Sequence, residues 1–546
     1  MRSVPSRRSV VVATAVGTAT AALSLDAPSA HAKATRRRQG AAADRGPCFV
    51  HGVASGDPLP DGVLLWSRVT PSPEATPGSG KGEPVTVGWE IALDRHFDQV
   101  AAQGRIKASA SGDHTVKADV RGLRPATDYW YRFHCGSATS PIGHTRTAPR
   151  HDAVPDAIRF GVVSCANWEG GWFSPYRHLA DRYDLDAVLH LGDYIYESAT
   201  YAGQGPIARL HHPLHECVSL GDYRARHGTY KTDPDLQALH SVTPVIAIWD
   251  DHEFADAAWA HGAENHQPET EGSWTDRAAA ARRAYFEWMP VRPSIAGTTY
   301  RQLSFGSLAM LFLLDLRSFR NAPGGSAEDP LDVTITGRTQ MDWLKNGLAT
   351  SDAGWQLVGN SVMMSPVRLP DLPLPELRAL SDSLGSASQL RPLNPDSWDG
   401  YTADRRELLQ HLDSHHIGNT VFLTGDVHCA WAAHVPLEKK ARTDSGVAVE
   451  FVVTSVSSDN FGDQLAPPRP SAARVEAAVV TPTRTSSGST LPHTATPSSA
   501  SSGRVQMDYF AVTDRMTPHA PSSLKPPTVY VPAAACGRVG SPVRPE

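Results

Sequence analysis

Five apolar, strand-like runs in this chain each end on a residue whose side chain can bind a metal ion. The runs are 158–165, 187–193, 245–251, 355–360 and 421–426, and their end residues are Cys165, Asp193, Asp251, Asn360 and Asp426. Turn signals and helix-like stretches follow the runs, which is an α/β pattern. Ligands in open α/β sheets gather outside the carboxyl ends of the strands. The pattern therefore predicts one polar cleft that holds more than one metal ion.

The length and charge of the chain restrict its organisation and its partners. At 546 residues it has room for two or three domains, and its net charge of −6 is mild. Such a charge does not favour binding to a polyanion, so no specific nucleic acid is expected as a partner. We expect a monomer.

Residues 1–32 have the features of a twin-arginine export signal. Arg7 and Arg8 precede a weakly apolar stretch rich in Ala, Thr and Val, and Ala30-His31-Ala32 is a small-x-small cleavage site. The stretch is too short and too rich in Thr to span a membrane. We therefore predict a protein secreted by the twin-arginine route, with the Tat translocase as its partner during export. A chance arginine pair at a disordered end is the alternative.

Residues 33–47 are predicted to be a basic linker, and residues 48–150 a small β-domain. Short strand signals recur in that domain, and residues 120–133 resemble the tyrosine-corner entry to a late strand of a fibronectin-type sandwich. Cys48 and Cys135 bracket the domain and are predicted to form a disulfide, because exported proteins can pair their cysteines.

Residues 156–515 are predicted to form an α/β domain. Within it, residues 465–503 are rich in Ser, Thr, Pro and Ala, and we predict a low-complexity insertion there that forms a loop or is disordered. A strand at 505–512 is predicted to complete a sheet, and residues 516–546 are predicted to be an irregular tail.

Asp193 lies in the most specific segment, 191–197. A strand-end carboxylate can bridge two cations, since its oxygens suit metals roughly 3.5–4 Å apart. Tyr196 follows three residues later, where one turn of helix would return its phenol to the same ion. A phenolate suits ferric iron, and the charge of the metal lowers the pKa of the phenol. The alternative is a simple turn at a strand end.

Residues 250–253 are four consecutive polar residues after an apolar strand, which is costly unless they bind something. We predict that Asp251 is a metal ligand and that His252 contacts a substrate phosphate or its leaving group. The alternative is a helix N-terminus with Asp caps.

Three further residues can complete a two-metal site. Asp426 and His428 form an i, i+2 pair, which faces one way on an extended strand. The thiolate of Cys165 is a reasonable ligand for iron or zinc, although a buried cysteine is more often a small apolar residue. The amide oxygen of Asn360 suits a harder ion such as calcium.

Together these segments resemble the PhoD-like alkaline phosphatase and phosphodiesterase family, a branch of the calcineurin-type metallophosphoesterases. The match runs from about His51 to Asn460, and its further motifs lie at 51–58, 315–320, 358–363 and 396–401. The resemblance implies a four-layer αββα sandwich preceded by a small Ig/fibronectin-like β-sandwich.

The resemblance also implies the roles of the candidate residues. Fe³⁺ would be held by Cys165, Asp193, Tyr196 and His428. Asp193 would bridge to a second ion, Ca²⁺ or another divalent metal, shared with Asp251, Asn360 and Asp426. His252 and Arg317 would contact the substrate phosphate.

The expected activity is that of a secreted alkaline phosphatase, with attack on the phosphate ester by a metal-bound hydroxide. His252 would protonate the leaving alkoxide. A phosphodiesterase or phospholipase D-type enzyme on the same centre is the alternative, with phospholipids and teichoic-acid-type diesters as substrates. A second alternative is a non-enzymatic surface binding protein that metal ions stabilise. No Gly-x-Ser-x-Gly segment supports a serine hydrolase.

Three departures from the family pattern stand out. Asp256 and Ala257 occupy positions where the family often has an Asn pair, which puts a third-ion site in doubt. The stretch 481–503 replaces an Asn-Pro-His-containing segment, and Cys429 stands where a Ser is common.

Overall fold

The computed structural model describes most of the chain from Cys48 onward. The described residues are 48–200, 206–292, 297–323, 333–366, 395–437, 446–460, 486–490, 494–501, 504–512 and 514–532. The predicted export signal and linker lie outside these ranges. Residues Arg45–Glu546 form one compact unit. No helix within the described ranges has the length and apolarity that a membrane crossing requires.

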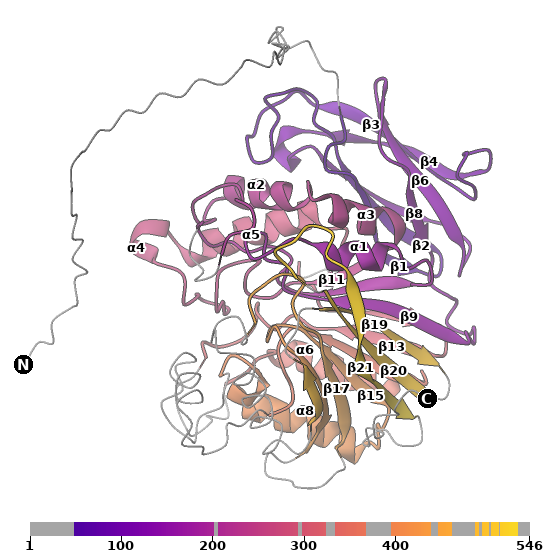
Figure 1. Cartoon of the computed structure of the whole chain (residues 1–546), viewed down its shortest axis with the longest axis vertical. Coiled ribbons are helices and arrows are strands. Elements are labelled where there is room, and N and C mark those ends of the chain that lie inside the picture. Colours follow the sequence, from indigo (N-terminus) through magenta and orange to yellow (C-terminus); the bar gives the residue numbers. More distant parts are fainter. Residues whose placement is uncertain are drawn as a thin grey trace, which may run out of the picture. The chain divides into compact units, whose positions relative to one another are not determined.

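Sheet A is a nine-stranded sheet with the order β21-β20-β19-β9-β10-β11-β1-β2-β5 (Figure 1). Its central strands β9, β10 and β11 are parallel and nearly all apolar, as expected for strands covered on both faces. The strands are β1 (Val53–Leu59), β2 (Gly62–Arg68), β5 (Thr115–Arg121), β9 (Ala157–Val163), β10 (Ala187–Leu191), β11 (Val245–Ile248), β19 (Thr494–Ser501), β20 (Arg504–Val512) and β21 (Ser522–Pro532).

Sheet B is a seven-stranded sheet with the order β12-β13-β14-β15-β17-β16-β18. It packs face to face on sheet A through an apolar core, in which the rings of Phe160 and Phe305 meet edge to face at 4.9 Å. The strands are β12 (Arg301–Phe305), β13 (Ala309–Leu313), β14 (Trp355–Asn360), β15 (Thr420–Thr424), β16 (Ala430–Val435), β17 (Ala448–Val452) and β18 (Ser486–Thr490).

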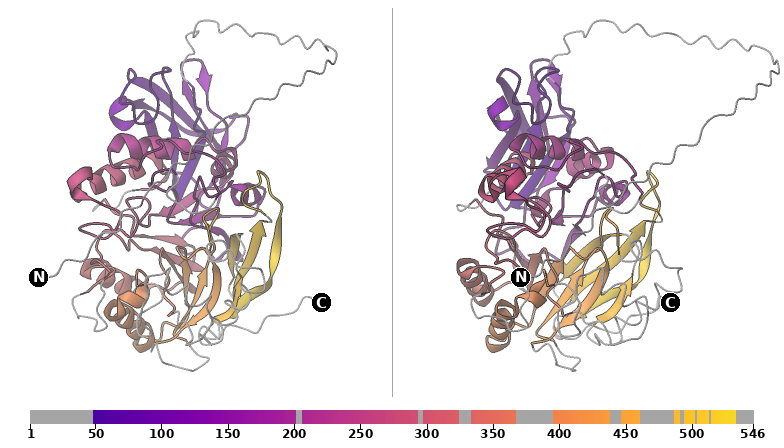
Figure 2. Two further views of the ribbon diagram at one scale, coloured as in Figure 1. Left: turned by 60° about the vertical axis from the view of Figure 1, so that its left-hand side comes forward. Right: turned by 90° about the vertical axis from the view of Figure 1, so that its left-hand side faces the viewer.

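Helices pack on the outer faces of both sheets, as the two views of Figure 2 show. Those on sheet A are α1 (Ser174–Ala180), α2 (Leu220–Tyr230), α3 (Pro234–Val242) and α5 (Trp274–Trp288), with the short α4 (Pro268–Glu271) nearby; those on sheet B are α6 (Arg338–Thr350) and α8 (Thr402–Ser414). Local sequence explains where helices begin: the Ser219 and Ser273 side chains accept from the backbone N–H groups of Asp222 and Asp276. The predicted α/β class is confirmed.

Sheet C lies in the N-terminal region and packs against β1, β2 and β5. Its strands are β3 (Val85–Ala92), β4 (Val100–Ala108), β6 (Asp128–Cys135), β7 (Ala138–Thr139) and β8 (Gly143–Arg146). The Tyr129 hydroxyl accepts a 2.8 Å hydrogen bond from the Arg124 N–H, which is the predicted tyrosine-corner contact. Sheet A crosses the predicted boundary near residue 150, because β1 pairs in parallel with β11. The boundary and the Ig-like assignment stay predictions.

Three expectations about local structure are wrong. Part of 465–503 forms β18 and β19, because the open edge of a strand offers backbone hydrogen bonds to a segment of any composition. β18 pairs with β16, and β19 pairs with β9 from Thr496 opposite Val162. The supposedly irregular tail contains β21, which pairs with β20. The predicted disulfide does not form, since Cys48 and Cys135 are both free thiols. The backbone of Cys48 forms a bridge with that of Thr70, whereas Cys135 is the last residue of β6 in sheet C. The predicted strand at 505–512 is confirmed as β20.

Candidate metal centre

The carboxyl ends of the parallel strands in the two sheets meet at one edge. β9, β10 and β11 are neighbours in sheet A, and β14 and β15 are neighbours in sheet B. A backbone bridge joins Ser164 to Ser455, and the Val456 N–H donates to the Ser164 carbonyl at 2.9 Å. The turns that carry the predicted strand-end residues therefore lie together, as the parallel-strand argument requires.

Four of the candidate metal ligands have left-handed backbone conformations. The φ angles are 58° at Cys165, 54° at Asp193, 66° at Asp426 and 54° at His428. Such conformations cost on the order of 1–3 kcal/mol each and cluster at functional sites. Gly192, with a φ of 102°, permits the turn after β10, because a Cβ there would lie 2.8 Å from the Asp250 backbone nitrogen.

One cluster joins the predicted iron ligands. The ligand atoms of Cys165, Asp193 and His428 lie within 4.8 Å of one another. The Tyr196 hydroxyl lies 3.1 Å from Asp193 Oδ2 and 3.2 Å from His428 Nε2. Thiol, carboxyl, phenol and imidazole groups from three separate segments thus converge on one position.

A second cluster shares Asp193 with the first. Its other members are Asp251 and His252, with ligand atoms again within 4.8 Å. His252 Nδ1 lies 2.8 Å from Glu197 Oε2, and its ring lies 4.1 Å from that of Tyr196. Because the Nδ1 atom of His252 contacts Glu197, its Nε2 atom is the nitrogen that can bind a metal or a phosphate.

Asn360 is held in a fixed orientation beside β15. Its amide oxygen accepts from the Trp398 indole N–H at 2.9 Å, and its amide nitrogen donates to Thr424 Oγ1 at 2.8 Å. The Trp398 contact leaves one lone pair of the amide oxygen for another partner. Asn360 therefore remains a predicted calcium ligand, outside the two clusters of His, Cys and carboxyl groups.

Arg317 lies fully buried among carboxylates. Its guanidinium is 2.5 Å from Asp250, 2.7 Å from Asp396 and 3.6 Å from Asp251, and Asp396 also pairs with Arg320. The structure thus places Arg317 beside the second cluster, and its predicted contact with phosphate stays a prediction.

Several acidic groups are buried close together at this site, which favours the binding of cations. Burial raises the pKa of Asp193 and of Asp426 well above the usual range, and the Asp250 carboxylate adds to both rises. Burial and the Asp193 charge likewise raise the pKa values of Cys165 and Tyr196. Asp193 Oδ1 is fully buried and has no hydrogen-bond partner among the residues that the structure describes. Bound cations would neutralise these groups and satisfy that oxygen, so the residues fit a metal centre.

Sequence reasoning missed the residues that position the ligands. Glu253 accepts from the backbone N–H groups of Asp193, Tyr194 and Asp250 at 3.0, 2.5 and 2.7 Å. It thereby ties the turns after β10 and β11 together. The Ser458 hydroxyl donates to the Tyr196 oxygen at 2.7 Å. The run of four polar residues at 250–253 was the one available signal for Glu253.

Two local arguments about the ligands are wrong, and the helical alternative at Asp251 is wrong as well. Tyr196 reaches Asp193 from a bend, not from a turn of helix. Asp426 and His428 lie beyond the end of β15 in a left-handed loop, so the extended-strand reason for their shared direction is wrong. No helix begins at Asp251, whose carboxylate instead accepts from the Ala257 N–H at 2.7 Å.

The structure also locates two of the departures from the family pattern. The Asp256 N–H donates to Glu197 Oε1 at 2.8 Å, and burial raises the pKa of Asp256 to about 6. Cys429, the residue that follows His428 in the sequence, is buried. Both residues therefore lie in the immediate surroundings of the two clusters.

The metal-free protein should become less stable as the pH rises from about 7 to about 8, above the usual pKa of histidine, where the buried histidines whose pKa is lowered no longer change charge. Burial raises the pKa of Glu253 to about 7, so the folded state binds protons that the unfolded chain has already released. Burial by itself lowers the pKa of His252, but the Glu197, Asp251 and Asp193 carboxylates outweigh burial and raise that pKa. The raised pKa of His252 therefore also makes the folded state less stable as the pH rises. Unfolding by urea, followed across this range in chelator, measures the slope. The metal-loaded protein is the control and should show a shallower slope; a metal-free protein that gains stability with pH would contradict the prediction.

The comparisons with known proteins agree with this geometry. Residues 160–509 match the family model of the PhoD-like phosphatase, and residues 32–149 match that of the PhoD-like phosphatase N-terminal domain. The chain is 35% identical over 433 residues to alkaline phosphatase D of Bacillus subtilis (strain 168), covering 76% of this chain and 70% of that protein.

Two solved structures extend the comparison to the fold. The structure of PhoD superposes with a TM-score of 0.78 at 30% identity, covering 91% of this chain and 92% of that one. The purple acid phosphatase PPD1 from yellow lupin seeds superposes with a TM-score of 0.52 at 13% identity, over 85% and 72% of the two chains, and shares the fold alone. The chain therefore belongs to the PhoD-like phosphatase family of metal-dependent phosphoric ester hydrolases.

Proposed function

We propose that the protein is a secreted alkaline phosphatase with an iron–calcium centre. The observation that carries the proposal is the pair of clusters that share Asp193. Cys165, Tyr196 and His428 on one side offer thiolate, phenolate and imidazole, which suit Fe³⁺. On the other side lies Asp251 of the second cluster. With Asn360 and Asp426, which the sequence adds to this side, it would offer oxygen ligands that suit Ca²⁺.

The bound cations would lower the pKa of a coordinated water and neutralise charge on the phosphate oxygens. His252 is placed to hold a proton for the leaving group. Burial lowers its pKa, but the Glu197, Asp251 and Asp193 carboxylates raise it well above the usual value. Because Glu197 accepts from Nδ1, the proton on Nε2 is the one available to a leaving alkoxide. Arg317, held by Asp250 and Asp396, would contribute positive charge beside the phosphate.

The rest of the proposal rests on sequence features and on the family. Export by the twin-arginine route follows from residues 1–32, and a monomer is expected. The N-terminal region would form an Ig/fibronectin-like module before a four-layer αββα domain. Phosphate monoesters are the proposed substrates, because a centre that is buried among strand ends favours a small terminal phosphate. Phospholipids and teichoic-acid-type polymers are the diester alternatives, and a metal-stabilised surface binding protein is the non-enzymatic one.

Relative rates on three substrates test the proposal. We expect p-nitrophenyl phosphate to be hydrolysed faster than bis-p-nitrophenyl phosphate, and phosphatidylcholine to be hydrolysed slowest. Chelation should abolish all three activities, and elemental analysis of the exported protein should find iron and calcium. A faster rate on either diester would favour the phosphodiesterase alternative. Metal removal that lowers the melting temperature of a protein without hydrolytic activity would support the surface-protein alternative.

A further inference from the structure

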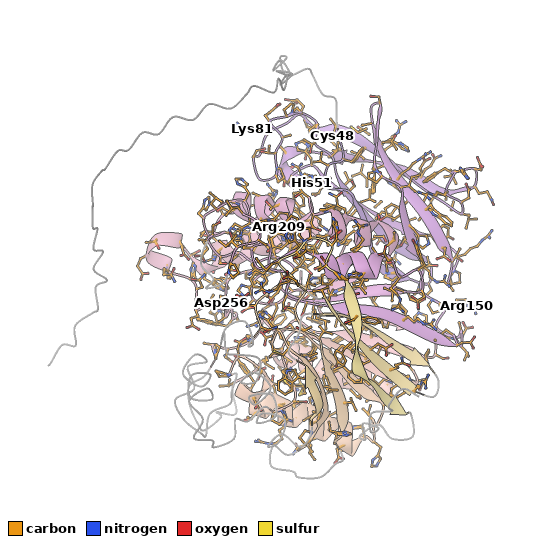
Figure 3. All side chains as sticks on the ribbon, viewed as in Figure 1. Cys48, His51, Lys81, Arg150, Arg209 and Asp256 are labelled. Atoms are coloured by element: carbon orange, nitrogen blue, oxygen red, sulfur yellow. The ribbon has the colours of Figure 1, made fainter. Side chains whose placement is uncertain are left out.

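A groove of about 850 Å³ lies at the end of sheet A that is opposite the metal centre. Its walls are the outer face of sheet C, the first residues of β9 and the loop between α1 and β10. Arg159 in the groove precedes Cys165 by six residues, which is roughly 20 Å along a strand. In Figure 3, Arg150, just before β9, and Asp256, beside the metal centre, lie on opposite sides of the view. The groove is thus separate from the site of hydrolysis.

The charged residues of the groove form a balanced network. Arg146 lies 2.7 Å from Asp128 and 3.7 Å from Asp186, and Arg182 lies 2.8 Å from Asp184. Four arginines and three carboxylates line the groove in all. The groove therefore presents hydrogen-bond donors and acceptors side by side, with little net charge.

Two aromatic side chains add flat apolar surface to this network. Trp130 on β6 is partly buried and meets the His144 ring at 5.4 Å. Tyr183, in the loop before β10, is 92% exposed. A tyrosine that is so exposed contributes little to the core, so its ring is available to a ligand.

We propose that this groove binds a neutral oligosaccharide chain. Each sugar hydroxyl both donates and accepts hydrogen bonds, so it can use the guanidinium and carboxylate groups together. The C–H faces of a sugar ring are apolar and can pack on Trp130 or Tyr183. The four arginines and three carboxylates nearly cancel, so the groove offers no strong net attraction to a highly charged ligand of either sign. The volume lies in the upper part of the range for small-ligand sites, about 300–1,000 Å³, and suits a short segment of such a chain.

Isothermal titration of the metal-loaded enzyme tests the proposal. The probes are the neutral β-1,4-linked tetrasaccharides of glucose and of N-acetylglucosamine, with tetragalacturonate as the acidic counterpart. We expect at least one neutral tetrasaccharide to bind. Tyr183→Ala should weaken that binding roughly 3- to 10-fold through the loss of ring packing, whereas Tyr183→Phe should retain it. Hydrolysis of p-nitrophenyl phosphate should be unchanged in both variants, because the groove is remote from the metal centre.

Val154→Ala is the matched control, since Val154 is 79% exposed and does not line the groove. It should leave binding and hydrolysis unchanged. Failure of both neutral tetrasaccharides to bind at millimolar concentration would overturn the proposal. So would binding of tetragalacturonate alone, or neutral-sugar binding that Tyr183→Ala leaves intact. The result does not depend on the phosphatase assignment, because binding and hydrolysis are measured separately.

Discussion

Replacing Asp193 by Asn should empty the metal centre and yet make the metal-free protein more stable. Asp193 belongs to both clusters, so its loss removes the carboxylate that they share and that can bridge two cations. Without metal, burial makes the ionised form of this carboxylate unfavourable, and Asp251 and Asp250 repel it. Asparagine has a similar shape without the charge. The metal-free variant should therefore unfold at a higher temperature than the metal-free parent.

The loss of activity should be large. Metal ions supply several kcal/mol of transition-state stabilisation, and each 1.36 kcal/mol is a factor of ten, so we expect a fall of roughly 10³-fold or more. Elemental analysis, melting curves in chelator and rates on p-nitrophenyl phosphate measure the three effects. Asp152→Asn is the control, because Asp152 is exposed and, within the described part of the chain, forms its ion pair with the exposed Arg150. A variant that keeps both metals would contradict the bridging role.

Replacing Arg317 by Ala should destabilise the fold as well as slow the reaction. The Arg317 guanidinium is fully buried against Asp250, Asp396 and Asp251. Its removal leaves buried carboxylates without their counter-charge, which typically costs about 3–5 kcal/mol. The phosphate-binding role predicted from the sequence would by itself predict no loss of stability.

Unfolding in urea, with metals present, measures this effect. Arg338→Ala is the matched control: Arg338 also pairs with two carboxylates, Asp342 and Glu407, but its side chain is 59% exposed. Such a surface network should contribute only about 1 kcal/mol or less. If Arg317→Ala proves no more costly than Arg338→Ala, the buried ion-pair network does not stabilise the protein.

The sequence predicted the elements that local pattern controls. The strands β9, β10, β11, β14 and β15 could be located because each is an apolar run that ends on a polar residue. The convergence of their end residues followed from one rule about parallel strands, which the order of sheets A and B satisfies. Composition was a poor guide at 465–503, because strands β18 and β19 depend on the open edges of neighbouring strands.

By itself, then, the amino-acid sequence determined which side chains could meet at a metal centre, because strand length and the residue at each strand end are local properties. The tertiary structure alone decided how those side chains are held. Glu253 reaches Asp193 across 60 residues, Ser458 reaches Tyr196 across 262, and Arg317 reaches Asp250 across 67. Hydrogen bonds and ion pairs between segments so far apart have no periodicity that a sequence could reveal. Their geometry exists only once the two sheets have packed together.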